Sequence, residues 1–257
     1  MTRDFSTISP SARSLLKVKA HTTLPFARRA AELVFGTDEV AVANAGPDAE
    51  ARRRHFELRA RSIDAVLDEL AATRVIELAA GLSFRGLDRA ARTPVTYLDT
   101  DLPAIIELKA ALVAQLAPTE LAGTLHVQAL DALDTAAFRA AVALLPPGEI
   151  AIVHEGLLMY LDDDEKARLA ANIREALCDR GGAWVTADVY VRSEHHLHRE
   201  DHVKQFLIEH RVEERKFADW PAAETFFAAH GFRVMNKHAP STDPLRVRET
   251  WVMTAVS

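Results

Sequence analysis

Apolar runs that end in a carboxylate alternate with helix-like segments through the middle of the chain. One run ends near Glu77 and is followed by a turn of small residues, and a second run ends at residues 99–101, about twenty residues later. This order predicts a strand, a loop, a helix and a second strand. The alternation continues with strands expected at 124–127, 149–154 and 183–188 and helices at 103–116, 135–144 and 163–178. It predicts an α/β doubly wound Rossmann-like fold, a mostly parallel sheet with helices on both faces.

The N-terminal segment departs from this alternation. Residues 9–35 predict two short helices, broken near Thr22–Pro25 and stopped at Gly36, so that residues 1–46 form a helical N-terminal cap. Residues 37–46 show little periodicity. A long helix is then expected from Pro47–Asp48 to about Leu70. Its predicted buried face consists of Phe56, Ile63, Val66, Leu67 and Leu70.

The last seventy residues also depart from it. Residues 192–211 are polar and helix-like, and residues 220–230 predict a second helix that ends at Gly231. Strands at 232–236 and 248–255 then predict an antiparallel hairpin at the C-terminal edge of the sheet. We expect one domain over residues 1–257, with residues 192–230 as a helical lid insertion.

The turn after the first strand helps to choose a cofactor. A pyrophosphate needs dense glycine where backbone amides approach it, but residues 77–83 contain only Gly81. Glu77, just before the turn, would repel a dianion and attract the ammonium of an amino acid. These features favour S-adenosylmethionine over NAD. An acid about twenty residues past the turn can accept hydrogen bonds from ribose hydroxyls, and Asp99 and Asp101 both lie at that distance.

Composition narrows the function classes. The chain has 257 residues, of which 49% are hydrophobic and 26% charged, which suits one large α/β core. The formal net charge of −6 argues against a nucleic-acid partner, and Arg52–Arg54 is interpreted as a solvated helix face. No apolar run has membrane-span length and the first residues lack a signal-peptide pattern, so we expect a cytoplasmic enzyme without a membrane partner. Cys178 is expected to be a packed thiol.

Several separated segments resemble the leucine carboxyl methyltransferase family and its bacterial relatives, the polyketide-type O-methyltransferases. The most specific is the run Glu155-Gly-Leu-Leu-Met-Tyr-Leu161. The others are residues 8–13, 56–59, 75–85 and 97–103 with 107–109. The resemblance covers most of the chain and implies a class I methyltransferase sheet of seven strands with one reversed, and S-adenosylmethionine as the cofactor.

The resemblance also implies where the cofactor lies. Arg13 and Arg59 match basic positions expected to bind its carboxylate, since an arginine can grip a carboxylate with two donors. Its amino-acid end is expected at Glu77, Ala79 and Gly81. One of Asp99 and Asp101 should bind the ribose, while the other caps the helix that starts at Pro103. The loop after the third strand should lie at the adenine, with Leu130 and Asp131.

Glu155 follows the fourth strand, so it is expected where cofactor and acceptor meet. The substrate-side candidates are Glu155, Tyr160 and His195. His198 and His202 share a helix face at a metal-like spacing, but the segment lacks a defined ligand set, so no metal site is expected.

These features predict an S-adenosylmethionine-dependent O-methyltransferase that acts on a carboxylate or hydroxyl of a small molecule. A carboxylate acceptor is already ionised at neutral pH, whereas a phenol would want a general base such as His195 or His154. The alternatives are a nicotinamide-dependent oxidoreductase and a non-catalytic paralogue that binds S-adenosylmethionine.

Overall fold

The computed structural model describes residues 10–42, 49–192, 208–239 and 249–256. Its centre is a seven-stranded sheet with the order β3-β2-β1-β4-β5-β7-β6. The first five strands are parallel, and β7 runs antiparallel to both β5 and β6. The strands are β1 (Arg74–Leu78), β2 (Thr96–Asp101), β3 (Thr124–Ala129), β4 (Ile150–His154), β5 (Gly182–Thr186), β6 (Phe232–His238) and β7 (Thr250–Ala255). The predicted α/β sheet and its antiparallel edge hairpin are confirmed.

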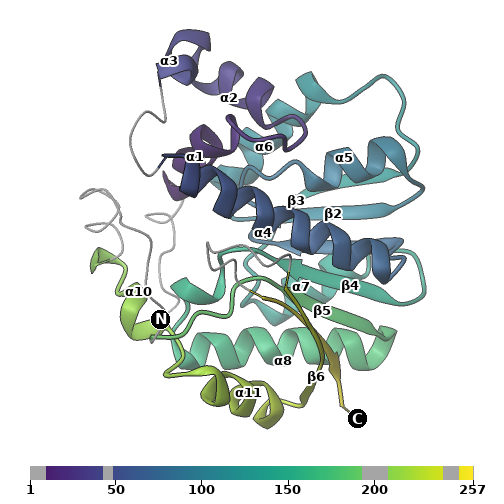
Figure 1. Ribbon diagram of the computed structural model, residues 1–257. Coiled ribbons are helices and arrows are strands. Elements are labelled where there is room, and N and C mark those ends of the chain that lie inside the picture. The colour runs from purple at the N-terminus through teal and green to yellow at the C-terminus, as the bar shows by residue number, and fades with distance from the viewer. Residues whose placement is uncertain (1–9, 43–48, 193–207, 240–248, 257) are drawn as a thin grey trace.

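Helices cover both faces of the sheet (Figure 1). One face packs against α4 (Ala49–Glu69) and α5 (Arg85–Arg92). The other packs against α7 (Thr135–Val142), α8 (Asp163–Arg180) and α11 (Trp220–Ala229). Helix α6 (Pro103–Leu116) lies beside β2 and β3 at the edge. The sheet is therefore buried on both sides, as a parallel sheet with crossover helices requires.

The twofold alternation of side chains along a strand decides which residues reach the site. In β1, Ile76 packs in the cluster with α7 and α8, whereas Val75 packs in the cluster with α4. Glu77 has the same parity as Val75 and so continues the row that faces α4. Asp99 in β2 and Glu155 after β4 continue the equivalent rows, behind Tyr97 and Val153. Three carboxylates therefore lie on the α4 face, at the carboxyl ends of neighbouring strands.

The N-terminal helices pack over one end of this face. Helices α1 (Pro10–Lys19), α2 (Ala27–Phe35) and α3 (Thr37–Val42) share an apolar cluster with α5 and α6. The expected stop at Gly36 is confirmed, since this residue has φ 86° and ends α2. Helix α3 was not predicted, because six residues are too few to show a helical period. Its first turn carries Asp38 and Glu39, which suit a helix N-terminus.

Two expectations about packing are wrong. Leu70 lies just beyond the end of α4 and is 43% exposed, because the chain turns there towards β1. Cys178 is exposed on α8 rather than packed. The core-facing residues of that part of α8 are Ala176 and Leu177, which leaves Cys178 on the outer side. The other short elements, η2 (Leu158–Tyr160) and α10 (Val212–Arg215), were not predicted.

Gly86 lets α5 lie close to β2, and Gly86→Ala tests this packing. A Cβ at this position would lie 2.7 Å from Tyr97 Cδ1 and 2.9 Å from Leu125 Cδ1. An exposed helical Gly-to-Ala change usually stabilises by about 1 kcal/mol. Here we expect overpacking to dominate and to lower the free energy of unfolding by about 1–3 kcal/mol, measured by urea denaturation. A stabilised variant would contradict the close approach.

Candidate functional site

The turn after β1 is held in a strained, fixed shape. Ala79 and Gly81 both have left-handed backbone angles, with φ 49° and 53°. The amide of Ala80 donates to the Thr100 carbonyl at 2.8 Å, and the amide of Gly81 donates to Asp101 Oδ2 at 2.7 Å. A non-glycine residue in this conformation costs about 1–2 kcal/mol, which is typical of functional turns. The predicted small-residue turn is therefore tied to the end of β2.

Helix α1 lies over this turn. A Cβ built on Gly81 would lie 3.6 Å from the Cβ of Ala12. The next residue, Arg13, was predicted to bind the cofactor but its side chain is exposed. Lys19 is instead the cation of α1 that reaches inwards, since it is 8% exposed and its Nζ lies 3.4 Å from Glu155 Oε1. The geometry therefore brings together Lys19 and Glu155, and not Arg13.

Arg59 and Glu155 form the ion pair at the centre of the site. Both Nε and Nη2 of Arg59 donate to Glu155 Oε1, at 3.0 and 2.7 Å. Its Nη1 donates to the hydroxyl of Tyr190 at 2.7 Å. The side chains of Arg59 and Glu155 are 4% and 6% exposed. The structure thus joins two residues that the sequence analysis selected in separate segments, ninety-six positions apart.

A second arginine, Arg85 at the start of α5, links four elements. Its Nε donates to Asp64 of α4 at 2.8 Å, its Nη1 donates to Glu77 of β1, and its Nη2 lies 3.3 Å from Glu155 Oε2. The other oxygen of Glu77 accepts from the Tyr97 hydroxyl at 2.6 Å. Glu77 is therefore fully engaged inside the protein, at 1% exposure.

Electrostatics fixes the charge state of this cluster. Burial alone would raise the pKa of Glu155, but Lys19, Arg59 and Arg85 hold it well below its usual value. Burial by itself would lower the pKa of Arg59, but the neighbouring Tyr190 and Glu155 raise it above its usual value. Burial lowers the pKa of Lys19, and Glu155 partly opposes this. The site is thus a carboxylate held by three cations.

The two aspartates of β2 have different surroundings. Asp99 is fully buried, and its Oδ2 lies 2.8 Å from Lys109 Nζ in an ion pair with no exposed surface. Burial raises the pKa of Asp99 to about 6, although Lys109 opposes the shift. Asp101 is half-buried and accepts from the amides of Gly81 and Leu102, both at 2.7 Å. Asp101 therefore keeps some exposed surface, whereas the Asp99–Lys109 pair has none.

The alternative capping role belongs to neither aspartate. The N-cap of α6 is Leu102, and no side chain caps the helix there. Proline at the first turn removes one of the donors that a cap would satisfy. Asp101 instead braces the turn after β1 against the start of α6.

The loop after β3 lies next to the end of β2. The amide of Leu130 donates to the Asp101 carbonyl at 2.8 Å, and the Leu130 side chain is 5% exposed in the core. Asp131 is half-buried, and its Oδ1 accepts from the amide of Leu133 at 2.9 Å. The predicted adenine loop is thus adjacent to the predicted ribose carboxylate.

A cluster of larger side chains lies beyond Glu155. Met159, Tyr190 and Val212 pack together, with Tyr160 against them. His210 meets the ring of Tyr160 edge-on, with centroids 6.3 Å apart. Burial raises the pKa of Tyr160 to about 12, while a hydrogen bond from Ser11 opposes the shift. In Figure 1, α1 and α10 lie at the same end of the sheet.

His195, His198 and His202 lie outside the described residues.

His154, at the end of β4, is unsuited to act as a general base. It has no exposed surface, and its ring packs 5.7 Å from Trp184. Its Nδ1 lies 3.3 Å from Thr186 Oγ1 and 3.8 Å from Asp188 Oδ2. Burial lowers the pKa of His154 to about 3, so that the imidazole is neutral and sealed from any acceptor. The suggested role of His154 as a base is wrong.

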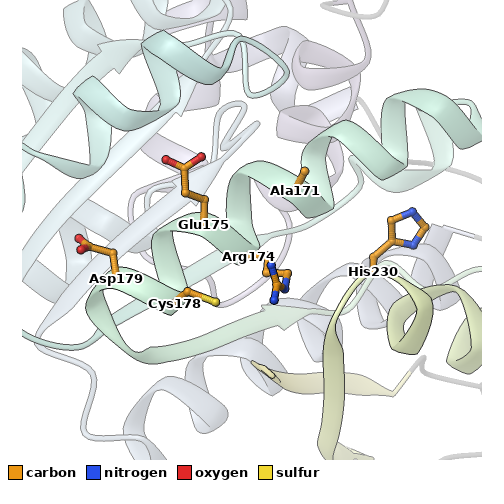
Figure 2. Close-up of a pocket in the computed structure, with 6 residues that line it drawn as sticks. All are labelled: Ala171, Arg174, Glu175, Cys178, Asp179 and His230. Carbon is orange, nitrogen blue, oxygen red and sulfur yellow. The ribbon is translucent and has the colours of Figure 1, made fainter. Parts of the chain in front are cut away.

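A surface hollow lies elsewhere, between α8 and the turn before β6 (Figure 2). It is lined by Ala171, Arg174, Glu175, Cys178, Asp179 and His230. These residues lie on the α8 side of the sheet, away from the α4 face that carries Glu77, Arg59 and Glu155. The hollow therefore does not belong to the site.

Sequence reasoning missed Lys19, Arg85 and Tyr190. Lys19 lies near the end of a short helix, where its direction depends on how the cap packs. Arg85 had a signal, because it opens the helix that follows the small-residue turn. Tyr190 lies past the end of β5, where no periodicity orients it.

Across the described ranges, no group of three His, Cys, Asp or Glu side chains is arranged to hold a metal ion, and no helix is long and apolar enough to cross a membrane.

A family model described as leucine carboxyl methyltransferase matches residues 9–174. The match includes the N-terminal helices, the turn after β1, and the turn that carries Glu155. A sequence search among curated proteins found no match.

Solved methyltransferases share the fold. A riboflavin-derivative dimethyltransferase, RosA from Streptomyces davawensis, matches with a TM-score of 0.54 and 19% identity over 98% of this chain and 70% of that one. The magnesium protoporphyrin IX methyltransferase ChlM from Synechocystis PCC 6803, solved with bound SAH, matches with 0.52 and 9% identity over 83% and 89%. The chain spans only 43% of a pericyclic reaction enzyme, with 72% of this chain covered, 12% identity and a TM-score of 0.50.

The buried His154 predicts a pH dependence of stability. Its pKa is about 6.5 when unfolded and about 3 when folded, so only the unfolded chain takes up a proton between these values. The contribution of His154 to the free energy of unfolding is therefore fully present above pH 6.5. It falls as the pH drops, by up to about 1.4 kcal/mol per pH unit. Urea denaturation between pH 4 and 7 should show a shallower slope for His154→Gln than for the wild type. Identical slopes would contradict the assigned burial.

Proposed function

Because this chain belongs to the leucine carboxyl methyltransferase family and is an S-adenosylmethionine-dependent methyltransferase, we propose that it methylates an oxygen atom of a small molecule. The observation that supports the cofactor site of this proposal is the buried set of Lys19, Arg59 and Arg85 around Glu155. A carboxylate is the favoured acceptor, since the family takes its name from carboxyl methylation. A hydroxyl is the second candidate.

The residues fit the amino-acid end of the cofactor. S-adenosylmethionine carries a carboxylate and an ammonium, and the site offers buried cations and buried carboxylates side by side. The cofactor carboxylate would replace Glu155 as the partner of Arg59 and Lys19, and the ammonium would face Glu155 and the turn at Ala79–Gly81. Such an exchange keeps every buried charge paired, as burial requires.

The nucleoside end fits the neighbouring strands. Asp101 is the ribose residue in this proposal, because Asp99 is sealed in its ion pair with Lys109. Leu130 and Asp131 would contact the adenine. Arg13 is left out of the carboxylate site, because its side chain is exposed and Lys19 takes that place.

When bound, the cofactor would supply a methyl group on a positively charged sulfur, for in-line transfer to an acceptor oxygen with S-adenosylhomocysteine as the leaving group. The protein's task is to hold the acceptor in that line. Met159, Tyr160, Tyr190 and Val212 would form the acceptor wall. An ionised carboxylate needs mainly orientation, and proximity can supply several of the roughly 7–11 kcal/mol available to well-oriented reactants.

A hydroxyl acceptor would need a base. With His154 sealed in the core, His210 beside Tyr160 is the described histidine at the acceptor wall. Residues 192–230 act as the lid in this proposal, within a single domain. A non-catalytic paralogue would bind the cofactor without transferring its methyl group, whereas a nicotinamide-dependent enzyme does not agree with the family.

The first test concerns Arg59. Arg59→Ala should weaken binding of S-adenosylhomocysteine by about 1.5–3 kcal/mol, the range for a hydrogen bond to a charged group. The measurement is isothermal calorimetry. Arg53→Ala is the control, because Arg53 lies on the same helix, six residues earlier, and should leave the affinity unchanged. Equal losses for both variants would refute the assignment of Arg59.

The second test concerns the acceptor. The protein is incubated with S-adenosylmethionine labelled in the methyl group and separate pools of small carboxylic acids and phenols. We expect base-labile labelled esters from the acids, with a rate that His210→Ala leaves unchanged above pH 6 and that a chelator does not affect.

Label in the phenol pool, with a rate lost in His210→Ala, would replace the carboxylate by a hydroxyl. Cofactor binding without label in either pool would favour the non-catalytic paralogue.

A further inference from the structure

The chain just beyond β5 supports both members of the Arg59–Glu155 pair. Asp188 and Tyr190 lie two and four residues after the last residue of β5. Asp188 has no exposed surface and Tyr190 is 3% exposed. Neither residue was selected from the sequence. Asp188 contacts the turn that follows Glu155, and Tyr190 contacts Arg59.

Asp188 holds the turn that follows β4. Its Oδ2 accepts from the amides of two consecutive residues, Leu157 and Leu158, the latter at 2.5 Å. The turn begins with Glu155 and passes through Gly156, whose backbone is left-handed at φ 80°. A buried carboxylate on two adjacent amides fixes the direction of the turn. Asp188 therefore fixes the backbone of the turn from which the Glu155 side chain extends.

Tyr190 holds the other member of the pair. Its hydroxyl accepts from Arg59 Nη1 at 2.7 Å, which orients the guanidinium so that Nε and Nη2 both face Glu155. The backbone around Tyr190 is itself anchored. The amide of Phe217 donates to the Tyr190 carbonyl at 2.9 Å, and the amide of Arg192 donates to the Phe217 carbonyl at the same distance.

We propose that Asp188 and Tyr190 are positioning residues for cofactor binding: Asp188 fixes the turn that carries Glu155, and Tyr190 fixes the guanidinium of Arg59. The inference rests on the proposed cofactor site. Binding groups gain affinity when their supports hold them in the bound geometry before the ligand arrives. The ring of Tyr190 also packs with Met159 and Val212, so this support extends from the cofactor side to the acceptor wall.

Calorimetry with S-adenosylhomocysteine tests the role of Asp188. Asp188→Ala should weaken binding about tenfold or more, whereas Asp188→Asn should stay within about threefold of the wild type, because its amide oxygen can accept from both backbone amides. Asp219→Ala is the matched control. Asp219 also accepts a backbone amide, from Ala222 at 2.7 Å, but it does so at the start of α11. This control should lower the melting temperature and leave the affinity unchanged.

Tyr190→Phe supplies the second measurement and does not remove packing. It should weaken binding severalfold in the wild type and have no further effect in Arg59→Ala, because that variant lacks the guanidinium that the hydroxyl orients. Equal losses in Asp188→Asn and Asp188→Ala, or additive losses for Tyr190→Phe and Arg59→Ala, would overturn the positioning roles. If Arg59→Ala alone leaves the affinity intact, the cofactor site itself is wrong. If Arg59→Ala weakens binding and Asp188→Ala does not, the site stands and the positioning role of Asp188 fails.

Discussion

The guanidinium of Arg85 is the interaction on which the arrangement of the site depends. It contacts Asp64, Glu77 and Glu155, and so joins α4, the start of α5, the end of β1 and the turn after β4. Its side chain is 3% exposed. Removing one partner of a buried ion pair leaves an uncompensated charge, at a cost of about 3–5 kcal/mol. The four elements are therefore constrained to meet at one place, which is the carboxyl end of the central strands.

This constraint explains how a site rich in charge can be buried. Lys19, Arg59 and Arg85 face Glu155, and Glu77 and Asp64 balance Arg85 from the other side. A ligand that brings one carboxylate and one ammonium can exchange partners with such a set without leaving a charge unpaired. The pyrophosphate of a dinucleotide would bring only negative charge to this set and no cation to pair with Glu155. The low glycine content of the turn and the charges around it thus both favour a cofactor with an amino-acid group over a dinucleotide.

The fold determines the proposed acceptor wall less than it determines the proposed cofactor site. The neighbouring structures share the sheet at 9–19% identity, yet one carries the name of a riboflavin-derivative dimethyltransferase and another that of a magnesium protoporphyrin methyltransferase. The fold therefore does not determine the acceptor. In this chain the wall comes from η2, the residues beyond β5, and α10, and all three follow the strands rather than forming part of them. Tyr190 is an exception within this wall, because its hydroxyl accepts from Arg59 and so joins the residues beyond β5 to the buried ion network.

The sequence by itself determined the sheet, because strands buried on both faces show as apolar runs and their crossover helices as a change of period. It also determined Glu77, Arg59 and Glu155 as candidates, since each lies in a motif or directly follows a strand. Only the tertiary structure decided that Lys19 rather than Arg13 points inwards, that Asp99 is sealed by Lys109, and that Cys178 lies outside. These outcomes depend on which helix face packs against which neighbour. Packing of this kind joins residues far apart in the chain, and no local pattern of polar and apolar residues records it.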